Sequence, residues 1–132
     1  MSIIFKDIEL VEEGKFIGLK ITGKLEKKDY NFFVPELERQ IKQYGKVNML
    51  LGLDDFHGWT AGAAWEDTKF GIRHFNDIKR LAIIGDKSWE KGMSIFCRPF
   101  TRAKVRYFDA NEKGQREAAE SWVKEDTETQ KP

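Results

Sequence analysis

Cysteine is nearly absent from this sequence, in which Cys97 is the one residue of its kind. A single cysteine excludes an internal disulfide and a zinc site built from cysteine ligands. An excess of charge is missing as well, since 23 basic and 22 acidic side chains leave a formal net charge of +1 at pH 7. Binding nucleic acid through bulk charge needs a strongly basic surface, so we expect no nucleic-acid partner.

Long apolar runs are missing too. No run approaches the roughly 18 residues that a membrane-spanning helix requires, so we expect no transmembrane segment. The first ten residues, MSIIFKDIEL, lack the basic segment and the following apolar segment that are typical of a signal peptide. The sequence also has no glycine-rich loop of the kind that holds phosphate groups. We therefore expect a cytoplasmic protein without a bound cofactor.

The composition that remains is that of an ordinary globular protein. The chain has 132 residues, of which 40% are hydrophobic and 34% are charged. This length suits one domain with a sizeable core. We expect that domain to cover residues 1–124, and the polar segment EDTETQKP at 125–132 to be a flexible tail.

Two periodicities alternate along the chain. Alternating and continuous apolar patterns predict five strands, at residues 3–10, 16–22, 47–53, 80–85 and 104–108. Helical spacing predicts four helices, over 27–44, over 61–75, from Asp86 to Pro99 and over 112–124. The order ββαβαβαβα predicts an α/β fold, in which a five-stranded, mixed and mostly parallel sheet carries about four helices on its faces.

The helix expected at 61–75 has an inner face that follows from its angular spacing. At 100° per residue, one side carries Ala61, Ala64, Trp65, Thr68, Ile72 and Phe75. We expect this side to lie on the sheet, with Trp65 buried there and Trp122 buried beneath the last helix. Phe70 then points outward near His74, so we expect these two residues to form the interface of a twofold-symmetric homodimer.

Polar and aromatic side chains gather where the expected strands end. In an open α/β sheet, ligands bind beyond the carboxyl ends of the strands. We therefore expect a concave site for a ligand or a protein partner at this edge. Its candidate residues are Asp54, Asp55, Phe56, His57, Trp59, Thr60, Asp86 and Trp89.

Most of these residues also have a structural interpretation. Asp86 and Thr60 are good N-caps for the helices that follow them, and Asp54 and Asp55 suit a turn. His57 beside two aspartates is compatible with a general base, a metal ligand or a hydrogen bond to a loop carbonyl. No motif with a known ligand spacing is present, so no metal is predicted. One histidine without a placed nucleophile does not complete a catalytic set, and we expect binding without turnover.

Three phrases of the sequence resemble one protein family. They are LDDFHGWTAGAAWEDTKFGIRHF, KRLAIIGDKSWEK and PFTRAKVRYFD, and they resemble the SpoIIAA-like family of small bacterial STAS/SEC14-type proteins. The resemblance runs from about Ile21 to Trp122 and implies a STAS-like α/β sandwich without a known enzyme activity. It places Thr60 where regulated relatives carry a phosphorylatable hydroxyl, although Trp59 stands where those relatives have an acidic residue.

Two classes of function follow from these patterns. The first is a non-enzymatic binding or regulatory module that engages a protein partner through the helix starting at Thr60. The second is a carrier of a small apolar ligand or lipid, in a pocket lined by Phe56, Trp59, Trp65 and Trp89. An enzyme that uses His57 and the aspartates ranks third. An exposed helix face favours the first function, and an internal cavity bordered by these aromatic rings favours the second.

Overall fold

The computed structural model describes residues 2–5, 8–74, 76–89 and 103–128 of the chain. Six strands form one sheet in which neighbours in sequence are neighbours in space. The strands are β1 (Ser2–Phe5), β2 (Ile8–Glu13), β3 (Phe16–Leu25), β4 (Val47–Trp59), β5 (Ile78–Gly85) and β6 (Lys104–Asp109). Strand β2 runs antiparallel to its two neighbours β1 and β3, and β3 to β6 run parallel. The predicted α/β class and mixed sheet are confirmed.

The sheet has one strand more than the five predicted. The segment 3–10, expected to be a single strand, forms part of the hairpin of β1 and β2, in which Ile4 pairs with Glu9. The two residues between these strands are lysine and aspartate; aspartate is common in turns, but no glycine, proline or asparagine accompanies it. An alternating pattern therefore could not distinguish one long strand from two short antiparallel strands.

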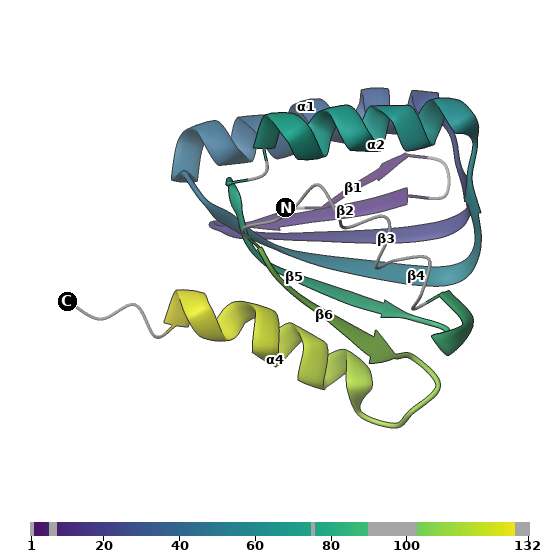
Figure 1. The fold of residues 1–132 in the computed structure, drawn as a ribbon. Helices are drawn as coiled ribbons and strands as arrows, with labels where there is room; N and C mark the ends of the chain where they lie inside the picture. The colour runs from purple at the N-terminus through teal and green to yellow at the C-terminus, as the bar shows by residue number, and fades with distance from the viewer. Residues whose placement is uncertain (1, 6–7, 75, 90–102, 129–132) are drawn as a thin grey trace.

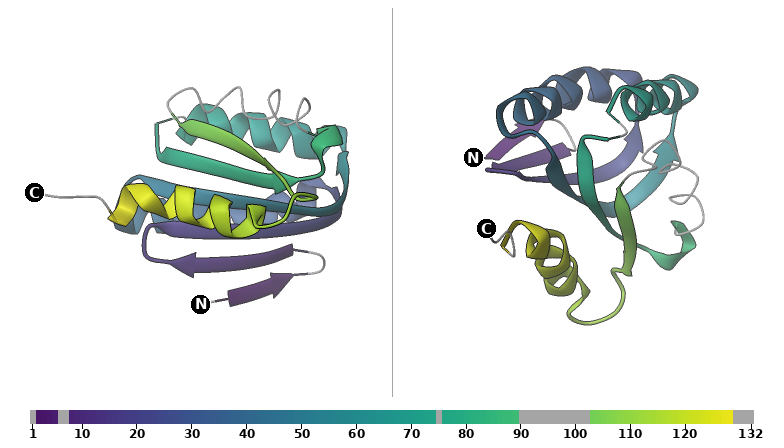
Figure 2. Two further views of the ribbon diagram at one scale, coloured as in Figure 1. Left: turned by 90° about the horizontal axis from the view of Figure 1, so that it is seen from below. Right: turned by 60° about the vertical axis from the view of Figure 1, so that its left-hand side comes forward.

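Helices cover both faces of the sheet. The helical segments are α1 (Lys27–Tyr44), α2 (Ala61–His74), the short 3₁₀ helix η1 (Lys87–Trp89) and α4 (Gln115–Glu128). Helices α1 and α2 lie side by side on one face, and α4 lies on the other (Figures 1 and 2). We call these the α1/α2 face and the α4 face. None of the helices within the described ranges is both long and apolar enough to cross a membrane.

Two expected segments differ in extent from the prediction. Of the helix expected from Asp86 to Pro99, the structure describes only η1 at its beginning, and residues 90–102 lie outside the described part. The last helix continues to Glu128, so the first residues of the expected flexible tail are helical.

Buried side chains form a separate layer on each face of the sheet. Alternate residues of β4 point to opposite faces, with Leu51 in the layer beneath α1 and α2 and Leu50 in the layer beneath α4. The α4 layer also contains Phe108 and Val123. A strand that is covered on both faces carries apolar residues continuously and not at every second position. This explains why the apolar segment VNMLLGL, at residues 47–53, was predicted to be a strand.

The predicted inner face of α2 is wrong. Ala61, Ala64 and Trp65 are exposed, with Trp65 at 61% of its full accessible surface. Ala63 and Phe70, two helical turns apart, are buried instead, and Phe70 is only 4% exposed. Apolar residues occupy both sides of this helix, so the angular pattern alone could not decide which side meets the core.

The correction to α2 removes the basis of the expected homodimer interface. Phe70 lies in the core beneath α1 and α2, where it is not available to a second copy of the chain. The side chain of His74 lies outside the described part of the structure. Trp122, which was also expected to be buried, is half-buried and stacks under the guanidinium of Arg80, whose carbon lies 4.9 Å from the ring centroid.

Two substitutions in α2 should lower stability to very different extents. Phe70→Ala is expected to lower the free energy of unfolding by about 3–5 kcal/mol, because it leaves a cavity in the core. Trp65→Ala is expected to lower it by less than about 1 kcal/mol, because an exposed side chain buries little surface. Urea denaturation followed by circular dichroism measures both losses. A larger loss for Trp65→Ala would show that α2 faces the sheet through its other side.

Candidate functional site

The stretch from Asp54 to Trp59 is a strand and not the expected loop. It continues β4 and pairs with β3 as far as the Leu25–Trp59 pair. The pairing skips one residue of β4 at each of two register shifts, so that Asp55 and His57 have no partner on β3. Such bulges bend a strand and re-aim side chains. The composition of this stretch is typical of a turn, which is why its continued pairing was not predicted.

The side chains of the two bulge residues lie close together at the surface. His57 Nε2 lies 3.5 Å from Asp55 Oδ1, and the two side chains keep 63% and 78% of their surface exposed. An exposed pair of this kind is screened by water and stabilises little. Asp55 has a positive φ of 52°, which a short polar side chain tolerates. Across the described ranges, no group of three histidine, cysteine or acidic side chains is placed to hold a metal ion.

Three of the four aromatic residues expected to line a pocket pack against one another. The ring centroids of Phe56 and Trp89 lie 4.9 Å apart, and those of Trp59 and Trp89 lie 5.9 Å apart. Trp89 Nε1 also donates a hydrogen bond of 3.0 Å to the carbonyl oxygen of Phe56. Through these edge-to-face contacts the three rings pack against one another and not around an open space between them. The fourth residue, Trp65, points outward from α2 and makes no ring contact with any side chain that the structure describes.

Thr60 connects the end of the sheet to the start of α2. Its hydroxyl oxygen accepts a hydrogen bond of 3.1 Å from the backbone N–H of Ala63, which confirms the predicted N-cap. Its own backbone N–H donates to the carbonyl oxygen of Leu25 at 2.9 Å. The beginning of α2 is therefore bound directly to the end of β3.

Asp86 follows β5 and caps η1. Its Oδ1 accepts a hydrogen bond of 2.9 Å from the backbone N–H of Ser88, as expected for a capping residue. This bond, with weaker contributions from the hydroxyl of Ser88 and the side chain of Asn111, lowers the pKa of Asp86 below its usual value. Asp86 therefore has a structural role at the start of η1.

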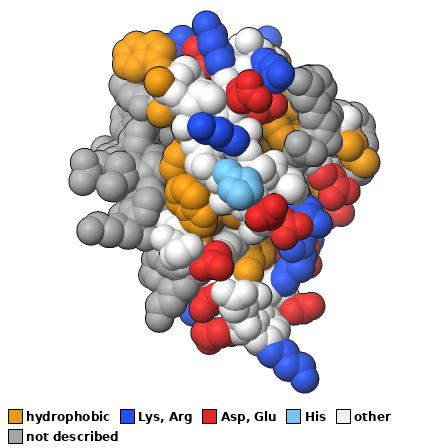
Figure 3. Space-filling view, turned by 90° about the vertical axis from the view of Figure 1, so that its right-hand side faces the viewer, with side chains coloured by type: hydrophobic (Ala, Val, Ile, Leu, Met, Phe, Trp, Pro, Cys, Tyr) orange, Lys and Arg blue, Asp and Glu red, His pale blue; other side chains and the backbone are white. Residues whose placement is uncertain are grey.

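The predicted residues are divided between the two faces of the sheet. Figure 3 views the edge formed by the carboxyl ends of the strands, where acidic, basic and hydrophobic side chains are interspersed. Phe56, Trp59 and Trp89 pack on the α1/α2 face. Asp54 instead lines a hollow of about 230 Å³ on the α4 face, together with Lys20 and Arg116.

Sequence reasoning missed these two cations. Lys20 was identifiable as a polar residue that points away from the core formed by its neighbours Leu19 and Ile21. Arg116 carried no such signal, because its position beside Lys20 depends on where α4 crosses the sheet.

The fold is that of a small α/β domain whose mixed sheet lies between two helical layers. The chain belongs to the SpoIIAA-like family, whose model matches residues 16–124. The resemblance inferred from the three sequence phrases is thus confirmed, and the match begins at β3. None of the curated proteins matches the chain.

A solved structure shares this fold. The crystal structure, at 2.25 Å, of an uncharacterized protein of the DUF3478 family with a SpoIIAA-like fold, from Shewanella loihica PV-4, is 26% identical in sequence. The similarity covers 88% of this chain and 91% of that chain, with a TM-score of 0.69.

The contribution of Asp86 to stability should depend on pH. Because its pKa is lowered in the folded state, its stabilising effect is present above the usual pKa of aspartate, about 4, and is lost as the pH falls through the folded value. Asp86→Ala is therefore expected to lower the melting temperature at pH 7, with a difference from the wild type that shrinks below about pH 4. Thermal melts across this range measure it, with Asp54→Ala as the control. A difference that is constant with pH would contradict a role for the charged form.

Proposed function

We propose that this protein is a non-enzymatic binding or regulatory module that docks a protein partner on the outward face of α2. The observation that carries the proposal is Trp65, a large aromatic side chain that is 61% exposed in the middle of this helix. Tryptophan is among the residues that most often dominate the energy of protein–protein interfaces. Its burial against a partner would remove from water the 61% of its surface that is still exposed.

The surroundings of Trp65 suit an interface. Ala61 and Ala64 are exposed beside it and are too small to shield the ring. Charged pairs lie farther along the helix, where Lys69 Nζ is 2.9 Å from Glu66 Oε2 and contributes most to lowering the pKa of Glu66. An apolar centre with a charged rim is the usual anatomy of a protein interface.

The helix that carries Trp65 is held firmly in place. The hydroxyl of Thr60 caps its first turn, and Ala63 and Phe70 are buried beneath it. Gly62 allows close packing against α1, since a Cβ atom there would lie 3.4 Å from Cβ of Lys27. A rigid docking surface loses little conformational entropy on binding, and this favours affinity.

The carrier function receives less support. The rings of Phe56, Trp59 and Trp89 contact one another, and Trp65 does not border them. A cavity on the α1/α2 face, lined by Leu19, Phe33 and Phe70 among others, has a volume of about 30 Å³. That volume is of the order of one water molecule, too small for a lipid.

Loss of the exposed ring should weaken partner binding without unfolding the protein. Trp65→Ala is expected to weaken binding of a purified partner at least about tenfold, because interface tryptophans commonly contribute more than about 2 kcal/mol. Partners are identified by placing a photo-crosslinking amino acid at position 65 in cells and analysing the adducts by mass spectrometry, and affinities are then measured by calorimetry.

Tyr44→Ala supplies the matched control, because Tyr44 is an exposed aromatic residue, at 38%, on α1. It should leave the affinity unchanged, and a crosslinker at position 44 should give no adduct with the same partner. Equal binding by wild type and Trp65→Ala would rule out docking through this face of α2.

A further inference from the structure

The α4 face of the sheet is only partly covered. Helix α4 packs over β4, β5 and β6, and the part formed by β1 and β2 extends beyond it (Figure 2). Two adjoining hollows lie along α4, with volumes of about 100 Å³ and about 230 Å³. They share Lys20, Gly52, Ile84 and Arg116, so they form one continuous groove. We call it the α4 groove.

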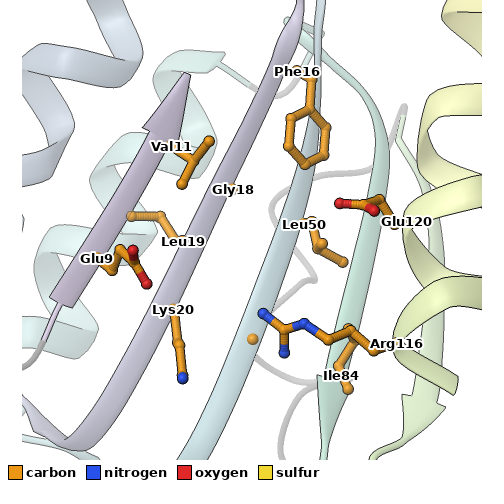
Figure 4. Close-up of a pocket in the computed structure, with 11 residues that line it drawn as sticks. Glu9, Val11, Phe16, Gly18, Leu19, Lys20, Leu50, Ile84, Arg116 and Glu120 are labelled. Carbon is orange, nitrogen blue, oxygen red and sulfur yellow. The ribbon is translucent and has the colours of Figure 1, made fainter. Parts of the chain in front are cut away.

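One end of the α4 groove is apolar. Val11, Phe16 and Leu50 line it, and Gly18, which has no side chain, pairs with Val11 and lies between it and Phe16 (Figure 4). Gly52 lies directly across from Lys20 in the pairing of β3 with β4, so no side chain fills the floor at that point. The groove thus offers an apolar surface that leads to a position beside two cations.

The two cations come from different elements and lie at the same level of the groove. Arg116 extends from α4 across β4, and Lys20 projects from β3 (Figure 4). Neither forms an ion pair with any residue in the described part of the chain, whereas Arg39, Arg73 and Lys124 do. Two unpaired cations on either side of an open floor favour an anion between them.

The acidic residues of the groove do not take this position. Glu120 lies one helical turn beyond Arg116 on α4, and its Oε2 is 3.9 Å from Lys124 Nζ of the same helix. Glu9 is the cross-strand neighbour of Lys20 on β2, and Asp54 lines the other end of the groove. These carboxylates restrict the groove to ligands of low negative charge, because a multiply charged anion would be repelled.

We propose that the α4 groove binds a small aliphatic monocarboxylate. Its carboxylate lies between Lys20 and Arg116, where the guanidinium offers a planar pair of donors that matches two carboxylate oxygens. Its hydrocarbon chain lies along the apolar end and covers the half-buried Val11, beside Phe16 and Leu50, which are already buried in the protein. The volumes are at or below the lower end of those of ligand sites, so the groove selects a short chain. This site is independent of the docking face on α2.

The test is a titration of the full-length protein with octanoate below its micellar concentration, followed by ¹H–¹⁵N NMR. Octanoate is expected to shift the amide signals of Gly18, Gly52 and Arg116 in a saturable manner. Acetate, which lacks the chain, and octylammonium, which reverses the charge, should bind at least about tenfold more weakly. Equal shifts with octylammonium, shifts confined to other parts of the protein, or no saturation with octanoate would overturn the proposal.

Variants locate the site. Lys20→Gln and Arg116→Gln are each expected to weaken octanoate binding about tenfold, because each removes a charged donor to the carboxylate. Lys113→Gln, an exposed lysine in the turn before α4, is the matched control and should bind as the wild type does. Gly52→Leu should block the groove, and Trp65→Ala should leave octanoate binding unchanged. Wild-type affinity in both Lys20→Gln and Arg116→Gln would exclude this groove.

Discussion

The pairing of Leu25 with Trp59 sets where the two helices of the α1/α2 face begin. Because β3 and β4 end together at this pair, α1 and α2 begin side by side, each after a single intervening residue. The hydrogen bond from Thr60 to the carbonyl of Leu25 and the capping box between Glu26 and Asp29 stabilise these two starts. The helices consequently run next to each other, and Ala63 and Phe70 are directed inward between α1 and the sheet.

The central strand serves both surfaces of the molecule. Leu51 and Phe56 of β4 support the helices on one face, while Leu50 and Gly52 form part of the α4 groove on the other. Since successive side chains of a strand point to opposite faces, one strand supplies a rigid support for two separate surfaces. The two surfaces are therefore on opposite sides of one sheet.

The order of elements was predictable because buried parallel strands such as 47–53 and 80–85 are short continuous apolar runs. The orientation of α2 was not, since Trp65 and Phe70 are both large and apolar, and only the packing against α1 decides between them. The extension of β4 beyond Asp54 depends on a partner strand distant in sequence. The proximity of Lys20 and Arg116 depends on the crossing of α4, so no local pattern could reveal that part of the candidate site.

Because of the two bulges of β4, positions 55 and 57 tolerate substitution to different extents. Asp55 and His57 stand outside the ladder of strand pairs and are exposed, so neither is constrained by core packing. Position 57 can therefore vary widely in size and charge while α2 stays in place. Position 55 is more restricted, because its positive φ suits glycine, asparagine or aspartate. Between these positions the buried Phe56 has to remain large and apolar, so only the residues on either side of it are free of core packing.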